Sequence, residues 1–501
     1  MRKTIATDWR SLGSALLALV PALGACAGDL GAAGNGDTGA GAGAPQVVPS
    51  GFYIDPNSSV LVRAPSVVDD STRTIDPCLN TDPNDALDAG ARARLANRKW
   101  TFGYLMSQMA SGITPDAFAR SWLSAWETST VLNNSGPADG DPLVEVRPDA
   151  QRDGSIANTK PLATLVREAW QQASGGAGKP LAMNKAPFRL LAIVNRFDLR
   201  KEPRRFGEGT GGELRFVFSV LALNGPGSFS PGQACAQYTG IANPDFGERG
   251  EQMVILEYAV NLATDAAKRD WVMRWADLTN YERGSEEFAS RLQALTEQIV
   301  VRGAGGSMRP NGSALIRIRT NETPNEVQWD LREFKIASTH GVVPDMVKQT
   351  PRGNDNGSAD LGLWMVRNSS AILADTYVVP NQLPRYQGYG SVSFLGAHAL
   401  NQVGNTVWAG SSRYPVSPDV RHEFSKNTCS GCHSRETGSL FFHVHGREPG
   451  QESTVSGFLG GADGYGNDDF CTSDPVTGQQ RCFNEMRRRT DDLLSFLNSG
   501  V

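Results

Sequence analysis

Five consecutive residues near the C-terminus combine the side chains that attach an iron porphyrin to a protein. They are Cys429, Ser430, Gly431, Cys432 and His433, a C-x-x-C-H arrangement. Two thiols at this spacing can react with the two vinyl groups on one edge of a porphyrin, while the next imidazole binds the iron. The chain has only seven cysteines and six histidines in 501 residues, so chance rarely produces this string. The motif predicts one covalent haem c, with His433 as the proximal iron ligand.

Two other uses of the same cysteines are open from the sequence. Cys429 and Cys432 could form a short disulfide, which would leave a structural or binding protein without haem. They could also join Cys471 and Cys482 in a zinc site, although the spacing of that second pair fits no common zinc-finger pattern.

A second axial ligand has three candidates after the motif. His443 and His445 lie in the string LFFHVHG, and Met486 is the only methionine that follows His433. We expect His443 to be the distal ligand, which would give a bis-histidine iron with a lower reduction potential than a histidine/methionine iron. If none of the three binds, the iron is five-coordinate and open to a small molecule.

Helical patterns flank the motif on both sides. Val420, Phe424 and Cys429 recur at helical spacing, which predicts a helix that carries the cysteines to the haem edge with Phe424 against the ring. Residues 483–499 place most of their apolar side chains on one face, as a terminal amphipathic helix does.

This arrangement resembles the small monohaem cytochrome c domains over residues 418–499. The resemblance implies a small α-helical, haem-binding segment at 418–501 that transfers electrons. The chain departs from that family in one respect, because those domains usually supply a methionine ligand from a loop before the closing helix, whereas Met486 lies inside that helix.

The N-terminus reads as an export signal. Residues 1–25 carry Arg2, Lys3 and Arg10 before an apolar run too short to cross a bilayer. The string LGAC, which ends at Cys26, resembles the lipobox of bacterial lipoproteins. That resemblance implies cleavage before Cys26, a lipid on its thiol and an outer-membrane lipoprotein, because Ala27 rather than Asp follows. The glycine- and alanine-rich residues 26–50 predict a flexible tether.

Export also suggests how the remaining cysteines pair. Disulfides persist outside the bacterial cytoplasm, where c-type haem is also attached. With Cys26 lipidated and two cysteines on haem, we expect a local disulfide between Cys471 and Cys482 and a long-range one between Cys78 and Cys235.

Residues 51–417 predict one large α+β domain with a mainly antiparallel sheet and flanking helices. Strand and helix do not alternate regularly, which argues against a parallel sheet. The Gly-, Asn- and Pro-rich residues 337–417 could be an extended connection or an edge of that domain. Strands are expected at 187–199, 213–223, 251–260, 313–319 and 326–336, and helices at 85–109, 114–127, 160–173, 264–281 and 284–300.

A second resemblance covers most of residues 185–500. The strings LLAIVNRFDLR, GELRFVFSV, IRTNET, WDLREF and HEFSKNTCSGCHSRETGSLFFHV are similar, in this order, to a set of large lipoproteins from proteobacteria, including myxobacteria, that end in a C-x-x-C-H region. That likeness implies that the large domain and the C-x-x-C-H segment form one unit.

Other features of the sequence limit the classes of function that it can have. The net charge is −5 with no dense basic patch, which disfavours nucleic acid as a partner. The common hydrolase and metalloprotease motifs are absent from the sequence, so whether the chain is an enzyme is left open. Charged residues within strand patterns, such as Arg196, Asp198 and Glu213, could be ion pairs or a polar cluster around the haem edge or a ligand. We therefore expect an envelope haem protein that transfers electrons to a partner protein or small carrier, or senses redox state.

Overall fold

The computed structural model describes residues 53–74, 97–132, 143–144, 162–201, 210–221, 252–306, 311–325, 328–386, 390–401 and 408–499. Residues 1–52 and Cys78 and Cys235 lie outside these ranges, as do the predicted export signal, Cys26 with its lipid, the tether and the predicted 78–235 disulfide. Within the described ranges, every helix is too short or too polar to cross a bilayer.

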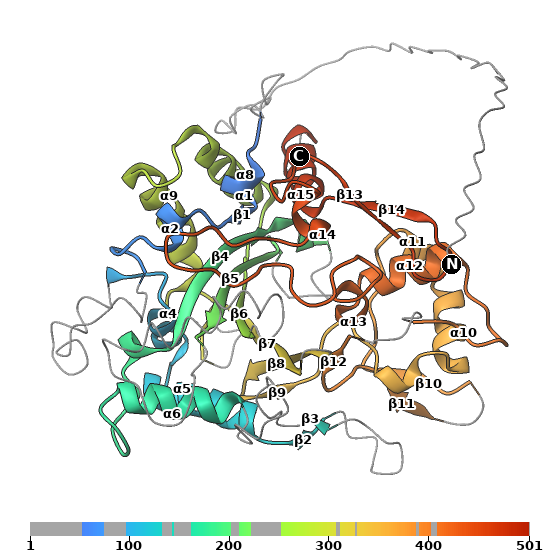
Figure 1. Ribbon diagram of the computed structural model, residues 1–501, viewed down its shortest axis with the longest axis horizontal. Coiled ribbons are helices and arrows are strands. Elements are labelled where there is room, and N and C mark those ends of the chain that lie inside the picture. The colour runs from blue at the N-terminus through green and yellow to red at the C-terminus, as the bar shows by residue number, and fades with distance from the viewer. Residues whose placement is uncertain are drawn as a thin grey trace, which may run out of the picture. The chain divides into compact units, whose positions relative to one another are not determined.

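An eight-stranded antiparallel sheet organises the chain (Figure 1). Its strands follow the order β1-β4-β5-β6-β7-β8-β12, and β9 also pairs with β8. From β4 to β8 neighbours in space are neighbours in sequence, so the centre of the sheet is a meander, as the absence of alternating helices predicted. The strands are β1 (Leu61–Val62), β4 (Phe188–Arg196), β5 (Glu213–Val220), β6 (Gln252–Ala259), β7 (Leu315–Asn325), β8 (Gln328–Ile336), β9 (Val342–Asp345) and β12 (Ala399–Leu400).

Helices cover one face of this sheet. Alternate strand residues such as Phe216, Val254 and Ile318 point to this face and pack with the apolar sides of the helices in one large hydrophobic core. Thr114 and Ser285 cap two of these helices by accepting a hydrogen bond from the backbone three residues on. The helices are α4 (Phe102–Met109), α5 (Pro115–Glu127), α6 (Leu162–Ala173), α8 (Asp265–Asp277) and α9 (Glu286–Val300).

The C-terminal residues pack over the opposite face. There Val217, Met253 and Trp329 form a second hydrophobic cluster with Phe442 and Leu459 from the C-terminal segment. The elements of this segment are α12 (Pro418–Lys426), α13 (Cys429–Cys432), α14 (Gly457–Gly460), the hairpin β13 (Phe470–Ser473) and β14 (Gln480–Phe483), and α15 (Glu485–Asn498). The structure thus confirms an α+β architecture with a large antiparallel sheet and flanking helices.

The described residues of 337–417 are not an extended connection, and through β9 and β12, which both pair with β8, they supply the edge that was one of the two predictions. They form short elements around a third hydrophobic cluster that includes Met365, Phe394 and Trp408 and reaches Phe424 of α12. The shortness of these elements explains why periodicity did not reveal them. They are α10 (Ala359–Arg367), α11 (Ser369–Leu373), β10 (Gln382–Pro384) and β11 (Ser391–Ser393), in addition to β9 and β12.

Other short elements complete the described part of the chain. Helix α1 contacts both α8 and α15, so the first described residues and the last are neighbours. These elements are α1 (Pro56–Ser59), α2 (Pro65–Val68), β2 (Thr130–Val131), β3 (Leu143–Val144), η3 (Met183–Lys185), η4 (Phe197–Lys201), η6 (Leu278–Asn280) and η8 (Gly353–Asp355).

Candidate functional site

The C-x-x-C-H motif lies on a helical turn of its own. Helix α12 ends at Lys426, and the predicted continuous helix through Cys429 is therefore wrong. The break occurs because Thr428 caps α13: its hydroxyl accepts from the Gly431 backbone N–H at 3.1 Å and from the indole N–H of Trp408 at 2.7 Å. This cap fixes the start of α13 at Cys429 and therefore the position of the first thiol.

Both motif cysteines are free thiols. The Sγ of Cys432 lies 3.2 Å from Nε2 of His443, and the backbone N–H of Cys429 donates to the hydroxyl of Thr350 at 3.0 Å. Burial raises the pKa of both thiols above its ordinary value. The two groups are thus neutral thiols at neutral pH and are not bonded to each other.

The imidazole of His433 is held in one orientation by two neighbours. Its ring stacks on Trp329 of β8, with centroids 4.1 Å apart and an angle of 13° between the planes. Its Nδ1 forms a hydrogen bond with the carbonyl oxygen of Phe441, which requires Nδ1 to carry the proton. Burial lowers the pKa of His433 to about 4, so the ring is neutral and Nε2 keeps its lone pair.

His443 contacts the motif directly. Its Nδ1 lies 2.8 Å from the hydroxyl of Ser456, and its ring centroid lies 4.3 Å from that of His433 and 5.1 Å from that of Phe458. Burial, and then the neighbouring His433, lower the pKa of His443 well below its usual range. Two axial imidazoles on opposite faces of a porphyrin have the macrocycle between them, so a distal role for His443 requires these rings to separate. That role stays a prediction.

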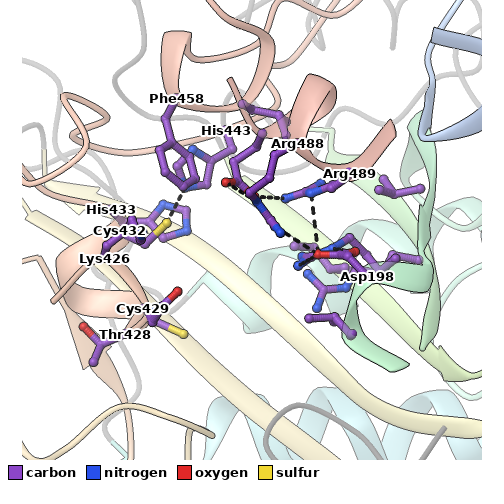
Figure 2. Close-up of a pocket in the computed structure, with 18 of the residues that line it drawn as sticks. Asp198, Lys426, Thr428, Cys429, Cys432, His433, His443, Phe458, Arg488 and Arg489 are labelled. Carbon is purple, nitrogen blue, oxygen red and sulfur yellow. Dashed lines mark hydrogen bonds and ion pairs between the residues drawn. The ribbon is translucent and has the colours of Figure 1, made fainter. Parts of the chain in front are cut away.

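A cavity of about 670 Å³ adjoins the motif, between the sheet and the C-terminal segment. Figure 2 shows the cysteines, His433, His443 and Phe458 at one end, and Asp198 with Arg488 and Arg489 at the other. This volume is within the range of pockets that hold cofactors and other small ligands. The apolar residues that line it are Leu61, Val194, Leu199, Val217, Met253, Ile255, Leu331, Ala374, Val444, Phe458 and Leu459.

The sheet wall of the cavity also carries a buried set of cross-strand ion pairs. Arg215 of β5 lies opposite Glu257 of β6 and pairs with it at 3.1 Å, and Arg319 of β7 lies opposite Glu333 of β8 and pairs with it at 2.7 Å. Glu213 pairs with Arg215 at 2.6 Å. Charges buried in this way are stable only when they are paired. The ion-pair interpretation of Glu213 is therefore correct, and Arg215 and Arg319 are also among the residues that line the cavity.

Arg196 and Asp198 confirm the ion-pair interpretation, and their role beside a haem or ligand stays a prediction. They form an ion pair with two distances of 2.9 Å, and both line the cavity. Burial opposes ionisation of Asp198, but Arg196, Arg489 and Arg488 outweigh it and hold the pKa of Asp198 far below its usual range.

Other residues named from the sequence lie away from the cavity. Phe424 packs with the ring of Tyr377, at 5.6 Å, in the third hydrophobic cluster instead of facing a porphyrin site. Cys471 and Cys482 form the predicted disulfide, which removes them from any zinc site with the motif cysteines. The described residues that line the cavity include His443 and neither His445 nor Met486.

His422 belongs to a separate buried cluster. It bonds to Glu436, and with Asp474 it forms the one group of three potential metal ligands found among the described residues. Arg421 donates to Glu436 at 2.6 Å and to Asp474 at 2.9 Å. The arginine supplies the positive charge that a metal would supply, so we interpret this cluster as structural.

Sequence reasoning missed two residues on the sheet side of the site. Met253 brings a thioether to the cavity wall, and Trp329 orients His433, although both precede the motif by 100 residues or more. No spacing rule connects these residues with the motif, because the pairing of strands brings them there.

Comparison with known proteins gives no relative: no protein-family model, no curated protein and no solved structure matches the chain.

Proposed function

We propose that the chain is a c-type haem protein of the bacterial envelope, held to the membrane by a lipid on Cys26, which transfers single electrons or senses the redox state of a partner. The observation that carries this proposal is the 670 Å³ cavity bordered directly by Cys429, Cys432 and His433. If the same motif lay on a part of the protein surface without a cavity, there would be no space beside it for a porphyrin.

The residues present fit an iron porphyrin. Two free thiols lie at the cavity, and the proton on Nδ1 of His433 leaves Nε2 to bind iron. A carbonyl partner of this kind is the usual way a protein orients a metal-binding imidazole. The apolar wall suits the macrocycle, and the basic side chains suit its carboxylates.

The roles of the residues follow from this fit. Cys429 and Cys432 would hold the haem through thioether bonds, His433 would bind the iron, and Trp329 would keep the imidazole in place. The haem would supply one-electron chemistry that the side chains alone lack. We retain the cytochrome c-like character of residues 418–501 and the outer-membrane location as parts of this proposal.

The competing function is a structural or binding lipoprotein without haem, in which Cys429 and Cys432 form a disulfide. The close approach of Cys432 to His443 is compatible with such thiol chemistry. However, burial raises the pKa of both thiols, which disfavours the thiolate that disulfide exchange requires.

A haem stain of the denatured full-length protein tests the proposal. The chain would be produced in a bacterial envelope that attaches haem, beside the double variant Cys429→Ala, Cys432→Ala. We expect a stained band at the size of the chain that is absent from the double variant. No band from the unmodified chain, while a co-expressed known c-type cytochrome stains, would contradict covalent haem.

A further inference from the structure

The end of the cavity away from the thiols is built from basic side chains. It is formed by the end of β4, by η4 and by α15, and we call it the arginine end; η4 and α15 contact each other. Its members are Arg196, Asp198, Arg200, Lys201, Glu485, Arg488, Arg489 and Asp492.

The acidic side chains of the arginine end are each shared between several cations. Asp198 accepts from Arg196 at 2.9 Å and from Arg488 at 3.1 Å, and Glu485 accepts from Arg488 at 2.7 Å and from Arg489 at 3.4 Å. Asp492 pairs with both Arg200 and Lys201. Five cations therefore face three carboxylates, which leaves a surplus of two positive charges.

The cations of the arginine end differ in how far they are exposed. The side chains of Lys201 and Arg488 are 63 % and 52 % exposed, whereas those of Arg196 and Arg489 are 14 % and 9 % exposed. The arginine end thus combines exposed cations with buried ones.

Arg489 is a buried cation with a hydrogen-bond donor that has no partner. Its Nε is buried without a hydrogen-bond partner, and the nearest ion-pair oxygen, Oδ2 of Asp198, lies 3.9 Å away. Burial and the neighbouring Arg196 lower the pKa of Arg489, which means that its surroundings disfavour the charged form of the guanidinium group. Guanidinium groups bind carboxylates through paired N–H donors. The negative charge of an added carboxylate would favour the charged form of Arg489.

We propose that the arginine end is a binding site for carboxylate groups. Two sources share this chemistry: the two carboxylates of a porphyrin in the same cavity, which rests on the proposed haem function, or a free carboxylic acid bound beside it. The two sources differ in whether the site is still open once haem is attached.

Thermal unfolding of the full-length chain with succinate as the probe tests this site. The haem-free form is the double variant Cys429→Ala, Cys432→Ala, and sodium chloride at equal ionic strength and neutral succinamide are the controls for salt and for shape. We expect a saturable rise in melting temperature with succinate alone.

In Arg489→Gln the apparent affinity for succinate should fall by roughly tenfold or more, as expected for loss of a charge-assisted bond. Arg487→Gln, an exposed neighbour on the same helix that pairs with Asp469, should respond as the parent does.

The haem-loaded chain separates the two sources. If succinate stabilises the haem-free chain and not the loaded chain, the porphyrin carboxylates occupy the site; if it stabilises both, the site takes a free carboxylate. A response no larger than the salt control, or an unchanged response in Arg489→Gln, would overturn the proposal. Should Arg489→Gln fail to fold by circular dichroism, Arg488→Gln replaces it with the same expectation. Failure of the haem stain would leave the succinate result intact, so the two proposals fail independently.

Discussion

At the scale of single residues, the orientation of His433 is set by two groups on different parts of the chain. Trp329 stacks on one face of the ring, and the carbonyl of Phe441 fixes the proton on Nδ1. For the proposed haem, the structure gives no such definite second iron ligand. His443 and Met253 both line the cavity and both carry an atom that can bind iron.

Replacing each candidate separately identifies the second ligand. We expect His443→Ala to convert a six-coordinate low-spin iron into a five-coordinate high-spin one, because a neutral imidazole is lost from the cavity. The absorption spectrum of the haem-loaded protein reports this change. Met253→Leu, which keeps the apolar volume, should leave the spectrum as it is. An altered spectrum in Met253→Leu with an unchanged one in His443→Ala would assign the thioether instead.

Local spacing could predict the motif half of the site and not the other half. Cys429, Cys432, His433 and His443 lie within 15 residues, so their chemistry can be read from the string. Arg489 and Arg196 are 293 residues apart, and they meet because α15 packs beside η4, which follows β4. That proximity depends on tertiary packing, which no local pattern records.

At the scale of elements, the crossing of α12 and α13 determines where the thiols lie. Gly431 permits this crossing, because a Cβ at its position would lie 2.1 Å from the carbonyl oxygen of Ser425. Only glycine fits at this contact without a shift of one element away from the other.

Gly431→Ala should therefore destabilise the motif. Forcing a methyl group into a filled contact typically costs 1–3 kcal/mol, so we expect a loss of about 2 kcal/mol in the free energy of unfolding and a lower yield of attached haem. Denaturant unfolding of the haem-free chain measures the first effect. Ser430→Ala, a buried neighbour that keeps the motif spacing, is the matched control. Equal stability of Gly431→Ala and the parent would mean that the crossing is not as tight as the structure shows.

The sheet was the most predictable part of the fold. The pattern of apolar residues placed β4, β5, β6 and β8 within about three residues of their observed bounds, whereas β7 continues six residues beyond the predicted end at 319. The break at Thr428 was not predicted, because it depends on a hydrogen bond from Trp408, which is 20 residues away. The same holds for Phe424, whose aromatic partners come from residues 337–417.

At the scale of the whole molecule, charged groups join the C-terminal helix to the rest of the chain. Asp198 accepts from Arg488 of this helix at 3.1 Å, and Asp492 of the helix pairs with Arg200 and Lys201. Within the helix itself, burial raises the pKa of the Glu485 carboxyl, but the charge and hydrogen bond of Arg488 and the charge of Arg489 outweigh burial and lower the pKa to about 2. Folding thus favours the ionised form of this group.

The stability of the chain should therefore depend on Glu485 in acid. A carboxyl with a lowered pKa in the folded state contributes stability above its unfolded pKa, and the contribution is lost as pH falls from about 4.5 to about 2. The linked free energy is on the order of 3 kcal/mol. We expect Glu485→Gln to be less stable than the parent at pH 7 and to show a shallower loss over this acid range, as measured by denaturant unfolding at a series of pH values. Parallel curves for the two proteins would contradict the assignment.

The most direct test of the central claim is the intact mass of the exported full-length chain, followed by mapping of its cysteine-containing peptides. We predict the added mass of one haem on the peptide that carries Cys429 and Cys432, and a disulfide between Cys471 and Cys482. A chain without added haem, whose Cys429 and Cys432 are joined by a disulfide, would contradict the haem assignment and the electron-transfer function with it.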